Sequence, residues 1–506
     1  MPKYFNLGSL IDFSKDQNKL AVIDLSASEP RHYTYAQLNS LIQSVSNGLN
    51  QEKIRRGSKV VIIAMNSIEY LAILWGTLRA GCIPVLINWK TNADRINYIL
   101  NEAQPSIIFY DKVSMVNYFK KTKCINLENE LKNFLVEGDF ETVRPNENEV
   151  AIIIYTSGSS GYPKGVLITH EAQIWLLENK LNDKNDLFDR QKICQILASP
   201  VCHLSGLSVA NIISAGHGTL VLMKEYDSNK FAIVIQLYKV NYVTVVPAMM
   251  SIFVKEYELT GGIDLSSVLL INFSSAPLSE NLVTSVKSIF PKVRYILNRY
   301  GLSEVGPGLF QVFHPKGIPL PPLSVGYPRN GIEYKIDEGV LKIKSPSMAL
   351  GYLSSNEDSK SSLDENGFFN TKDLFKTDEN GFYFYLGRND DMINCGGENI
   401  YPLEIERLLE SHPVVVQAIV VSVFDEIKGE KPYAFVLIKN EKKIKAQDLI
   451  KHCLENGSAN ICPRHIWRIS SIATNANGKL DKDFYKKLAK EIIFDNDIKS
   501  DAIVPF

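Results

Sequence analysis

The pattern of apolar and polar positions in the first quarter of the chain predicts alternating strands and helices. Residues 59–64 (KVVIIA) are a short apolar run rich in β-branched side chains, which is typical of a buried strand. Residues 68–80 place apolar side chains at helical spacing on one face. Strands are predicted again at residues 83–87 and 106–110, with a helix at 94–102 between them. This βαβαβ order predicts a parallel sheet with helices on its faces.

The pattern changes after a proline-rich connection at residues 315–322. Short predicted strands such as 340–344 and 381–386 alternate with glycine turns, which indicates a small antiparallel or barrel-like unit. From residue 391 onward the pattern predicts a compact α+β unit, with a helix at 403–410 and strands near 417–423 and 433–439. The predicted fold class is therefore α/β. Doubly wound sheets and a small β-barrel-like unit form a large N-terminal part, and a smaller α+β part follows.

Length and composition narrow the class of protein. The 506 residues predict about two to four domains. Hydrophobic residues make up 45% and charged residues 22%, and a net charge of -1 provides no basic field to attract nucleic acid. The seven cysteines include no C-x-x-C pair, which argues against a disulfide framework or a zinc cluster and fits a reducing cytosol. Because neither a signal peptide nor an apolar run near ~20 residues is present, we expect a soluble cytoplasmic protein with no membrane span.

The most informative segment is residues 155–165 (YTSGSSGYPKG), which follow a predicted buried strand at 151–155. Glycines let the backbone approach a ligand, hydroxyls donate hydrogen bonds and a lysine adds positive charge, a combination suited to a polyphosphate. The segment is not a Walker A loop, because a proline directly precedes the lysine. A flexible surface turn is the alternative. The position after the strand favours phosphate binding by Thr156, Ser157, Gly158, Ser159, Ser160, Gly161 and Lys164.

This segment resembles the signature of the adenylate-forming enzymes, a family of acyl-CoA and aryl-CoA ligases, peptide-synthetase adenylation domains and firefly-type luciferases. Further segments resemble the family's other motifs in the family's order, and they are PVCHLSG (200–206), SSAPL (274–278), NRYGLSE (298–304), FNTKD (369–373), LGRNDDMINCGGENIYPLEIE (386–406) and NGKL (477–480). The resemblance extends from about residue 33 to about residue 488. Because chance does not produce so many motifs in one order, the sequence is identified as a member most similar to acyl- or aryl-CoA ligases.

The resemblance implies an ATP-dependent reaction in two halves. A small-molecule carboxylic acid attacks the α-phosphate of ATP to give acyl-AMP and pyrophosphate, and a thiol then takes the acyl group and releases AMP. The implied cofactors are ATP, Mg²⁺ and coenzyme A, with the phosphopantetheine of an acyl-carrier protein as the alternative acceptor. The implied domains are an N-terminal adenylate-forming domain, 1–389, and a C-terminal lid domain, 390–506, which rotates about a hinge at Asp390.

The resemblance also assigns a nucleotide site. Tyr300 offers a flat face on which adenine can stack, and Asn298 offers an amide to read its edge; a core tyrosine and a turn asparagine are the alternatives. Asp373 would accept from ribose hydroxyls, Arg388 would donate to ribose or phosphate, and Glu304 would bind Mg²⁺. The remaining implied nucleotide contacts are Ser275, Ala276, Gly301 and Ser303.

Further residues are implied to act in catalysis. Lys479 would bridge the substrate carboxylate and the α-phosphate, whereas a lone lysine near the C-terminus is otherwise a solvated surface charge. His203 would gate the acyl pocket, although a satisfied core histidine is the commoner role of a single histidine. After adenylation the lid would turn Lys479 away and bring up a tunnel for pantetheine, with room provided by Gly396 and Gly397.

Two positions depart from the family pattern. Lys372 replaces the glycine of the T-G-D motif, and Lys428 stands where many CoA ligases have an aromatic residue that stacks on the adenine of CoA. The second departure leaves CoA and an acyl-carrier protein open as acceptors, and the sequence does not separate fatty, aromatic and succinylbenzoate-like acids. A non-catalytic member that binds nucleotide or a partner is the alternative of a different class. Only Lys372 supports it, and intact Lys479 and Glu304 argue against it.

Overall fold

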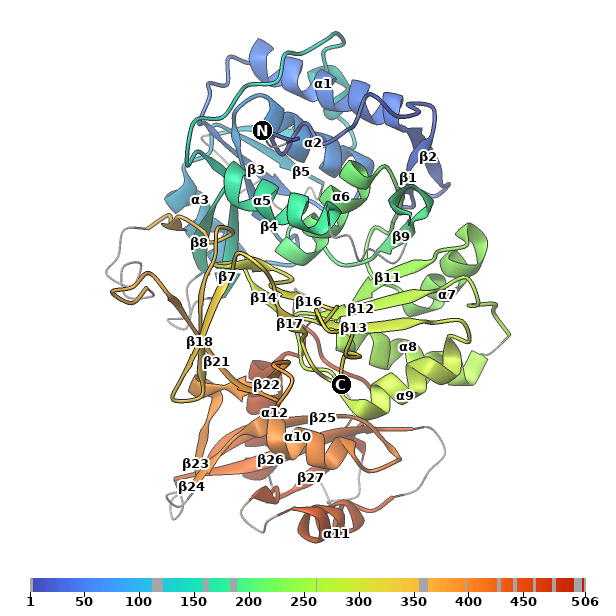
Figure 1. Ribbon diagram of the computed structural model, residues 1–506, viewed down its shortest axis with the longest axis vertical. Coiled ribbons are helices and arrows are strands. Elements are labelled where there is room, and N and C mark those ends of the chain that lie inside the picture. The colour runs from blue at the N-terminus through green and yellow to red at the C-terminus, as the bar shows by residue number, and fades with distance from the viewer. Residues whose placement is uncertain are drawn as a thin grey trace.

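The computed structural model has two large sheets with their helices in the upper part of Figure 1 and a smaller sheet with its helices at the lower end. It describes residues 3–111, 122–157, 163–182, 189–260, 262–354, 363–395, 398–425, 429–439, 444–457, 461–475, 479–495 and 503–504. Over these residues, no helix combines the length and the apolar character that crossing a membrane requires.

The first large sheet has the predicted parallel centre. The strands β3 (Lys59–Ile63), β4 (Ile83–Ile87) and β5 (Ile107–Tyr110) pair in parallel, which confirms the prediction from the βαβαβ pattern. Their side chains are buried on both faces, and this explains why the strands are continuous apolar runs. The described sheet has the order β20-β8-β7-β4-β3-β5-β6, in which the other strands are β6 (Lys123–Asn126), β7 (Val150–Ser157), β8 (Pro163–Thr169) and β20 (Gly351–Tyr352).

The helix predicted at residues 68–80 is buried more completely than a single apolar face requires. This helix, α2 (Ile68–Arg79), packs against α1 (Tyr35–Gln51) on one side and meets α6 (Leu204–Gly216) on another. The second contact includes a buried hydrogen bond, in which Trp75 Nε1 donates to Asn211 Oδ1 at 3.0 Å. The predicted helix at 94–102 is also present, as α3 (Ala93–Ala103), and a short helix, α4, spans Leu131–Phe134.

The second large sheet is parallel except for its edge pair of β1 and β2. Its described order is β13-β12-β11-β9-β10-β1-β2, with strands at Leu20–Asp24 (β1), Arg31–Thr34 (β2), Cys194–Leu197 (β9), Thr219–Leu222 (β10), Tyr242–Val245 (β11), Leu270–Ser274 (β12) and Tyr295–Arg299 (β13). The helices that accompany it include η2 (Arg190–Lys192), α7 (Ser228–Tyr238), α8 (Pro247–Thr260) and α9 (Glu280–Ile289), whereas α5 (His170–Leu181) contacts β7 and β8 of the first sheet. One apolar core contains side chains from both large sheets and from α2, α5 and α6, which lie between them (Figure 1).

The glycine-punctuated region forms the predicted antiparallel unit. Its main sheet has the order β18-β19-β21-β22, with strands at Glu333–Asp337 (β18), Val340–Lys344 (β19), Phe369–Thr377 (β21) and Tyr383–Arg388 (β22). Short pairs precede it, formed by β14 (Gly301–Leu302) with β15 (Gly306–Pro307) and by β16 (Phe310–Gln311) with β17 (Tyr327–Pro328). A single bridge between Gly326 and Tyr383 joins the two groups, so the described strands curve around a common core without closing into a full barrel.

The C-terminal part is the predicted α+β unit. Its strands are β23 (Ile393–Cys395), β24 (Glu398–Ile400), β25 (Val415–Asp425), β26 (Gly429–Ile438), β27 (Ile466–Ile469) and β28 (Ile503–Val504). Its helices are η4 (Asn389–Asp391), α10 (Pro402–Glu410), α11 (Ala446–Asn456) and α12 (Lys482–Asp495). The strands β25 and β26 pair antiparallel along their length, while β27 joins β26 in parallel. Proline at the start of α10 suits a helix N-terminus, where its missing N–H leaves no hydrogen bond unmade.

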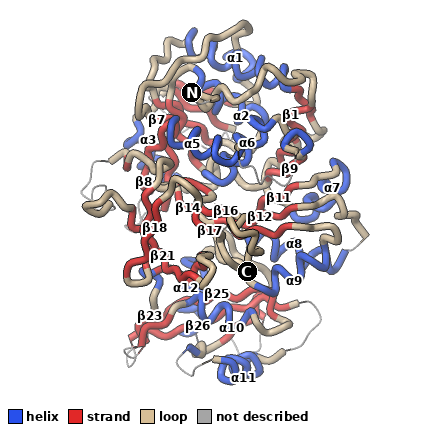
Figure 2. Tube along the Cα trace, in the orientation of Figure 1, coloured by secondary structure: helices blue, strands red, loops and turns tan. Residues whose placement is uncertain are grey.

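The C-terminal part packs against the rest of the chain in one defined orientation. Residues at the start of α8 join the core that β25, β26 and α12 form, and these are Val246, Ala248 and Met249. Asn281 Nδ2 of α9 donates to the carbonyl oxygens of His412 at 3.0 Å and Val415 at 3.3 Å. In Figure 2, α8 and α9 lie beside β25. The predicted domain boundary at Asp390 stays a prediction.

Candidate active site

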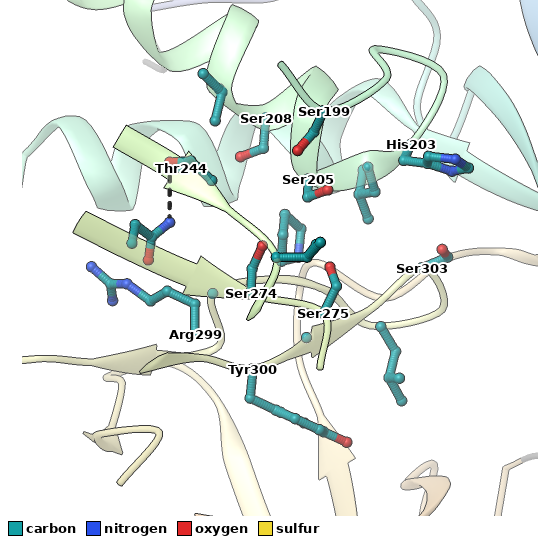
Figure 3. Close-up of a pocket in the computed structure, with 18 of the residues that line it drawn as sticks. Ser199, His203, Ser205, Ser208, Thr244, Ser274, Ser275, Arg299, Tyr300 and Ser303 are labelled. Atoms are coloured by element: carbon teal, nitrogen blue, oxygen red, sulfur yellow. Dashed lines mark hydrogen bonds between the residues drawn. The ribbon is translucent and has the colours of Figure 1, made fainter. Parts of the chain in front are cut away.

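A cavity of about 630 Å³ lies where the two large sheets, the antiparallel unit and the C-terminal part meet. Its walls include Thr156, Ser274 and Arg299, which lie at the carboxyl ends of β7, β12 and β13. In α/β proteins ligands bind at the carboxyl ends of parallel strands, where the connecting loops diverge and leave a crevice. Figure 3 shows hydroxyls entering the cavity from two sides, from Ser199, Ser205 and Ser208 on one side and from Ser274 and Ser275 on the other.

Most of the predicted site residues converge on this cavity. Its walls include Thr156, Lys164, His203, Ser275, Tyr300, Gly301, Ser303, Glu304, Arg388, Asp390 and Lys479. Asp373 is hydrogen-bonded to Tyr300 of the wall, whereas Ala276 is not among the described lining residues. Asn298 is also absent from the described lining, and its Nδ2 donates to the carbonyl oxygen of Leu323 at 2.9 Å. The predicted Gly158, Ser159, Ser160, Gly161, Gly396 and Gly397, and the side chain of Ser157, lie outside the described residues.

Tyr300 and Asp373 form the centre of what we call the nucleotide end, made of Tyr300, Glu304, Asp373, Arg388 and Lys479. The Tyr300 hydroxyl donates to Asp373 Oδ2 at 2.6 Å, and Arg388 Nη1 lies 3.9 Å from Asp373 Oδ1. Burial raises the pKa of Asp373 to about 6, although Tyr300 and Arg388 oppose the shift. The carboxylate is therefore ionised at neutral pH and presents acceptor oxygens, as a ribose contact requires.

The backbone at Lys372 explains why glycine is usual at this position of the motif. Its φ is 59°, in the left-handed region where side chains other than that of glycine are strained. The turn is nevertheless kept, because Lys372 N donates to Asn370 Oδ1 at 2.9 Å and Asp373 N donates to Thr371 Oγ1 at 3.1 Å. The Lys372 side chain is exposed, so the substitution leaves Asp373 buried and in position.

Lys479 lines the cavity, where its side chain remains exposed. Its side chain opens onto the cavity, and the protein around the cavity lowers the pKa of Lys479, while Asp373 and Glu304 oppose this shift. The backbone at Lys479 is fixed by a hydrogen bond, because Asn475 N donates to Lys479 O at 2.8 Å. The C-terminal part thus delivers one cation to the nucleotide end, beside two carboxylates of the N-terminal part.

Glu304 provides the carboxylate that a magnesium ion would need in the cavity. Its Oε1 accepts from the Tyr352 hydroxyl at 3.1 Å, which orients the carboxylate. Within the described ranges, no group of three or more His, Cys, Asp and Glu side chains could hold a metal ion. Mg²⁺ commonly binds one or two carboxylates together with substrate phosphates and water. The Glu304 carboxylate, in a cavity also lined by Lys164 and Lys479, therefore fits magnesium that arrives with a nucleotide.

The predicted hinge residue makes a strong contact within the site. Arg388 donates to Asp390 through Nε, at 2.6 Å from Oδ1, and through Nη2, at 2.8 Å from Oδ2. This two-pronged pair lowers the pKa of Asp390. Asp390 thus pairs with a residue of the nucleotide end, and its role as the hinge stays a prediction.

The region around His203 has the character of an acyl pocket. His203 precedes α6, and its Nε2 lies 3.2 Å from Asn88 Nδ2. Apolar side chains of α6 and the second large sheet line the cavity beyond it, including Val209, Ile212, Ile213, Leu270 and Leu297. Polar side chains also line the cavity. Two of them are hydrogen-bonded to each other, because Thr244 Oγ1 accepts from Gln195 Nε2 at 2.8 Å.

The sequence reasoning missed a second group of charged residues in the same cavity. Lys180, Arg190, Arg299 and Arg329 line it, and we call them the basic end. The three guanidinium groups lie close enough to the half-buried Lys180 to contribute, after desolvation, to lowering its pKa. Arg299 lies next to Tyr300 in the motif NRYGLSE, and this was the one available signal, because the other three residues lie outside the recognised motifs.

Comparison with known protein families shows to which family the chain belongs. The model of the AMP-binding enzyme family matches residues 12–353, and the model of the AMP-binding enzyme C-terminal domain matches residues 404–479. The chain belongs to the AMP-binding enzyme family. These matches confirm the resemblance to adenylate-forming enzymes. The first covers the segment that carries Tyr300 and Glu304, and the second covers the C-terminal part as far as Lys479.

Individual relatives agree with this family membership. The chain is 27% identical over 471 residues to 4-coumarate–CoA ligase 1 of Petroselinum crispum, covering 87% of this chain and 86% of that protein. It is 27% identical over 488 residues to a 2-succinylbenzoate–CoA ligase of Bacillus cereus, covering 92% and 95%. The structure of an anthranilate CoA ligase in complex with anthranoyl-AMP superposes with a TM-score of 0.85 at 23% identity, covering 97% of this chain and 98% of that one. This last similarity confirms the predicted fold class.

Proposed function

We propose that the protein is an AMP-forming acid–thiol ligase, which converts a carboxylic acid, ATP and coenzyme A into an acyl-CoA, AMP and pyrophosphate. The observation that carries the proposal is the convergence of Lys479, Glu304 and the hydrogen-bonded pair of Tyr300 and Asp373 on one cavity. These groups come from segments far apart in the chain. Each supplies a contact that the attack of a carboxylate on the α-phosphate requires.

Adenylation in this cavity depends on positioning and charge. A carboxylate oxygen of the acid attacks the α-phosphorus, the bond to the bridging oxygen of the β-phosphate breaks, and pyrophosphate leaves. Both reactants are anions, so a cation held between them lowers the barrier, and Lys479 can provide it. Asp373 accepts from the ribose hydroxyls and Tyr300 contacts the adenine, which together fix the nucleotide against the wall.

Glu304 holds magnesium in this proposal. When bound, the ion neutralises phosphate charge and polarises the phosphoryl oxygens. Tyr352 keeps the carboxylate oriented, and Lys164 at the end of the phosphate loop contributes positive charge on the same side.

Thioester formation requires a second arrangement of the C-terminal part. The present arrangement places Lys479 in the cavity, and Cys395 of the hairpin formed by β23 and β24 is not among the described lining residues. Rotation about Asp390 would remove Lys479 and bring this hairpin, with Gly396 and Gly397, to the acyl-adenylate. The contacts of Asn281 with the carbonyls of His412 and Val415 would break in that step.

The acceptor and the acid follow from the relatives and the cavity. We assign coenzyme A as the acceptor, because the curated relatives reported above are named as CoA ligases; an acyl-carrier protein is the alternative, to be tested by competition. The acid is a small molecule with an apolar body, as the walls near His203 indicate. We place the reaction in the cytoplasm, in keeping with the scattered cysteines.

The test is a coupled assay of the complete protein with ATP, Mg²⁺ and a panel of carboxylic acids. Pyrophosphate and AMP should appear only when an acid is present, and the thioester should form with coenzyme A in preference to a phosphopantetheinylated carrier protein. Accumulation of ADP would show that the chemistry is not adenylation. Tight ATP binding without pyrophosphate release for any acid would support a non-catalytic nucleotide-binding member.

A further inference from the structure

Lys482 occupies a position in α12 that does not by itself favour a lysine. It is the first residue of the helix, and the preceding Asp481 caps the helix, because its Oδ1 accepts from Phe484 N at 3.0 Å. The N-terminus of a helix carries partial positive charge, so a cation placed there is unfavourable on its own. The position of Lys482 therefore needs stabilisation from outside α12.

Two carboxylates of the C-terminal part provide this stabilisation. Lys482 Nζ lies 3.6 Å from Asp391 Oδ2 of η4 and 3.7 Å from Glu406 Oε1 of α10. Burial lowers the pKa of Lys482, but Glu406 and Asp391 outweigh this effect, so that the pKa is raised. The buried Glu406 is itself held in place, because its Oε1 accepts from Val420 N of β25 at 3.0 Å. Lys482 thus joins the start of α12 to η4 and to α10.

This junction lies next to two residues of the proposed mechanism. Lys482 follows Lys479, the cation proposed for adenylation, by three residues. Its partner Asp391 directly follows Asp390, the predicted hinge. Lys482 itself is not among the described residues that line the cavity. A shift at the start of α12 would therefore reach the reaction through Lys479 and not through a direct contact.

The backbone around Lys479 is held by two kinds of contact. Hydrogen bonds join it to the segment before it, since Asn475 N donates to Lys479 O at 2.8 Å. Just after Lys479, Asp481 N donates to Ala473 O at 3.1 Å. These bonds fix the local shape of the chain, but all of their partners lie between residues 473 and 481. The ion pairs of Lys482 are what connects this segment to η4 and α10.

From this arrangement we propose that Lys482 is a positioning residue for adenylation, which through its ion pairs with Asp391 and Glu406 keeps Lys479 at the nucleotide end. The inference rests on the proposed function, because it assigns a further residue to the same reaction. Lys482, Asp391 and Glu406 all follow Asp390 in the chain. They would therefore move together in the proposed rotation, and the ion pairs would serve the first half-reaction without opposing the second.

The experiment measures both half-reactions of Lys482→Met, which removes the charge and keeps much of the side-chain bulk. The kcat of pyrophosphate release should fall at least about tenfold, because a small displacement of a catalytic group is costly. The KM values for ATP and for the acid should stay within about twofold, as expected when a contact of the transition state alone is lost. Thioester formation from supplied acyl-AMP should change little. An unchanged kcat, or equal losses in both half-reactions, would overturn the proposal.

Matched variants separate positioning from a general effect of lost charge. Lys482→Arg keeps the cation and should retain most of the activity. Lys486→Met removes an exposed lysine one turn further along α12 and should leave kcat unchanged. In a protein that already carries Lys479→Ala, Lys482→Met should cause no further loss, because residues that act as a unit are not additive. A further loss of about fivefold or more in that background would show that Lys482 acts independently of Lys479 and would refute the proposal.

A milder variant keeps the test decisive if Lys482→Met does not fold. Asp391→Asn, at an exposed position, weakens only the contact with η4. It should lower the kcat of pyrophosphate release by about two- to fivefold, in keeping with the small energy of an exposed ion pair. A lower melting temperature with both half-reactions unchanged would assign the ion pairs to stability alone and reject the positioning role.

A labelling measurement distinguishes failure of this inference from failure of the proposed function. A trace of acetic anhydride is added with and without saturating ATP, and acetylation of Lys479 is quantified by mass spectrometry. ATP should slow this acetylation in the wild type and in Lys482→Arg, and much less in Lys482→Met. This pattern without pyrophosphate release from any acid would reject the ligase function and support the positioning of Lys479. Pyrophosphate release with equal protection in the wild type and Lys482→Met would leave the function standing and reject the inference, and so would a lack of protection in the wild type.

Discussion

The two ends of the cavity differ in how charge is balanced. At the nucleotide end, Lys479 and Arg388 face Asp373, Glu304 and Asp390, so that cations and carboxylates compensate one another. At the basic end, Lys180 has only cationic neighbours among the charged groups that shift its pKa. The nucleotide end therefore holds carboxylates beside its cations, whereas the charged groups that shift the pKa of Lys180 are all arginines.

The largest loss of activity is expected when Lys479, the cation that the C-terminal part places at the nucleotide end, is removed. Lys479→Ala should reduce adenylation at least about a hundredfold, because one preorganised charge contact is worth about 3 kcal/mol in the barrier. Thioester formation from supplied acyl-AMP should be spared if the proposed rotation of the C-terminal part turns Lys479 away before that step. Lys490→Ala, which removes an exposed lysine of α12, is the control. Equal damage to both half-reactions would contradict the division of labour.

The next pair of variants separates two roles of Asp390, the proposed backbone hinge and the side-chain contact with Arg388. Asp390→Pro fixes φ and should lower thioester formation at least about tenfold while acyl-AMP still forms. Proline also deletes the carboxylate that accepts two hydrogen bonds from Arg388. Asp390→Ala removes this pair but leaves the backbone free, so it should keep most thioester formation. Hydroxylamine trapping of acyl-AMP and single-turnover thioester assays measure the two steps. A proline variant that makes thioester at the wild-type rate would refute the hinge.

A pH profile tests the carboxylate of the nucleotide end. Burial raises the pKa of Asp373 to about 6, so the group is ionised above that pH and becomes protonated as the pH falls through it. The KM for ATP should therefore rise several-fold, by about three- to tenfold, below pH 6, because a protonated carboxyl group is the weaker acceptor for ribose.

The variant Tyr300→Phe provides a second test of this pH profile. It removes a hydrogen bond that lowers the pKa of Asp373, and the midpoint should move to higher pH. Tyr257→Phe, which removes a hydroxyl bonded to the Ile263 carbonyl oxygen away from the cavity, should leave the midpoint unchanged. A KM for ATP that is constant between pH 5 and pH 8 would argue against Asp373 as a ribose ligand.

The smallest expected effect concerns the backbone of the nucleotide end. Lys372→Gly relieves a left-handed conformation that costs about 1 kcal/mol, and the greater flexibility of unfolded glycine offsets part of this gain. We expect a net gain of about 0.5 kcal/mol in the free energy of unfolding. Lys376→Gly, at an exposed position of the same strand, should instead destabilise the protein. Denaturant titration of both variants would test the opposite signs, and a loss of stability in Lys372→Gly would contradict the strain.

The parts that could be predicted are those whose cause is local in the chain. The run at residues 59–64 predicted β3 because a strand buried on both faces must be continuously apolar. The segment NRYGLSE predicted Tyr300 and Glu304, because one short turn brings both to the same cavity. The prediction for α2 was incomplete, since its position between α1 and α6 buries the sides that the pattern left open.

By itself the sequence determined the α/β class and the family, because the motifs stand in one order along the chain; the same motifs predicted the residues that the fold brings together at the nucleotide end. Only the tertiary structure decided that Asn298 hydrogen-bonds a loop, that Asp390 pairs with Arg388, and that Lys372 keeps the turn of a glycine. The tertiary structure also decided which cations form the basic end. Lys180, Arg299 and Arg329 are far apart in the chain, and the packing of α5 against α6 and β15 brings Lys180 to the same cavity as the two arginines. The interaction energy of two charges depends on the distance between them in space. Spacing along the chain does not give that distance when the residues lie on different elements.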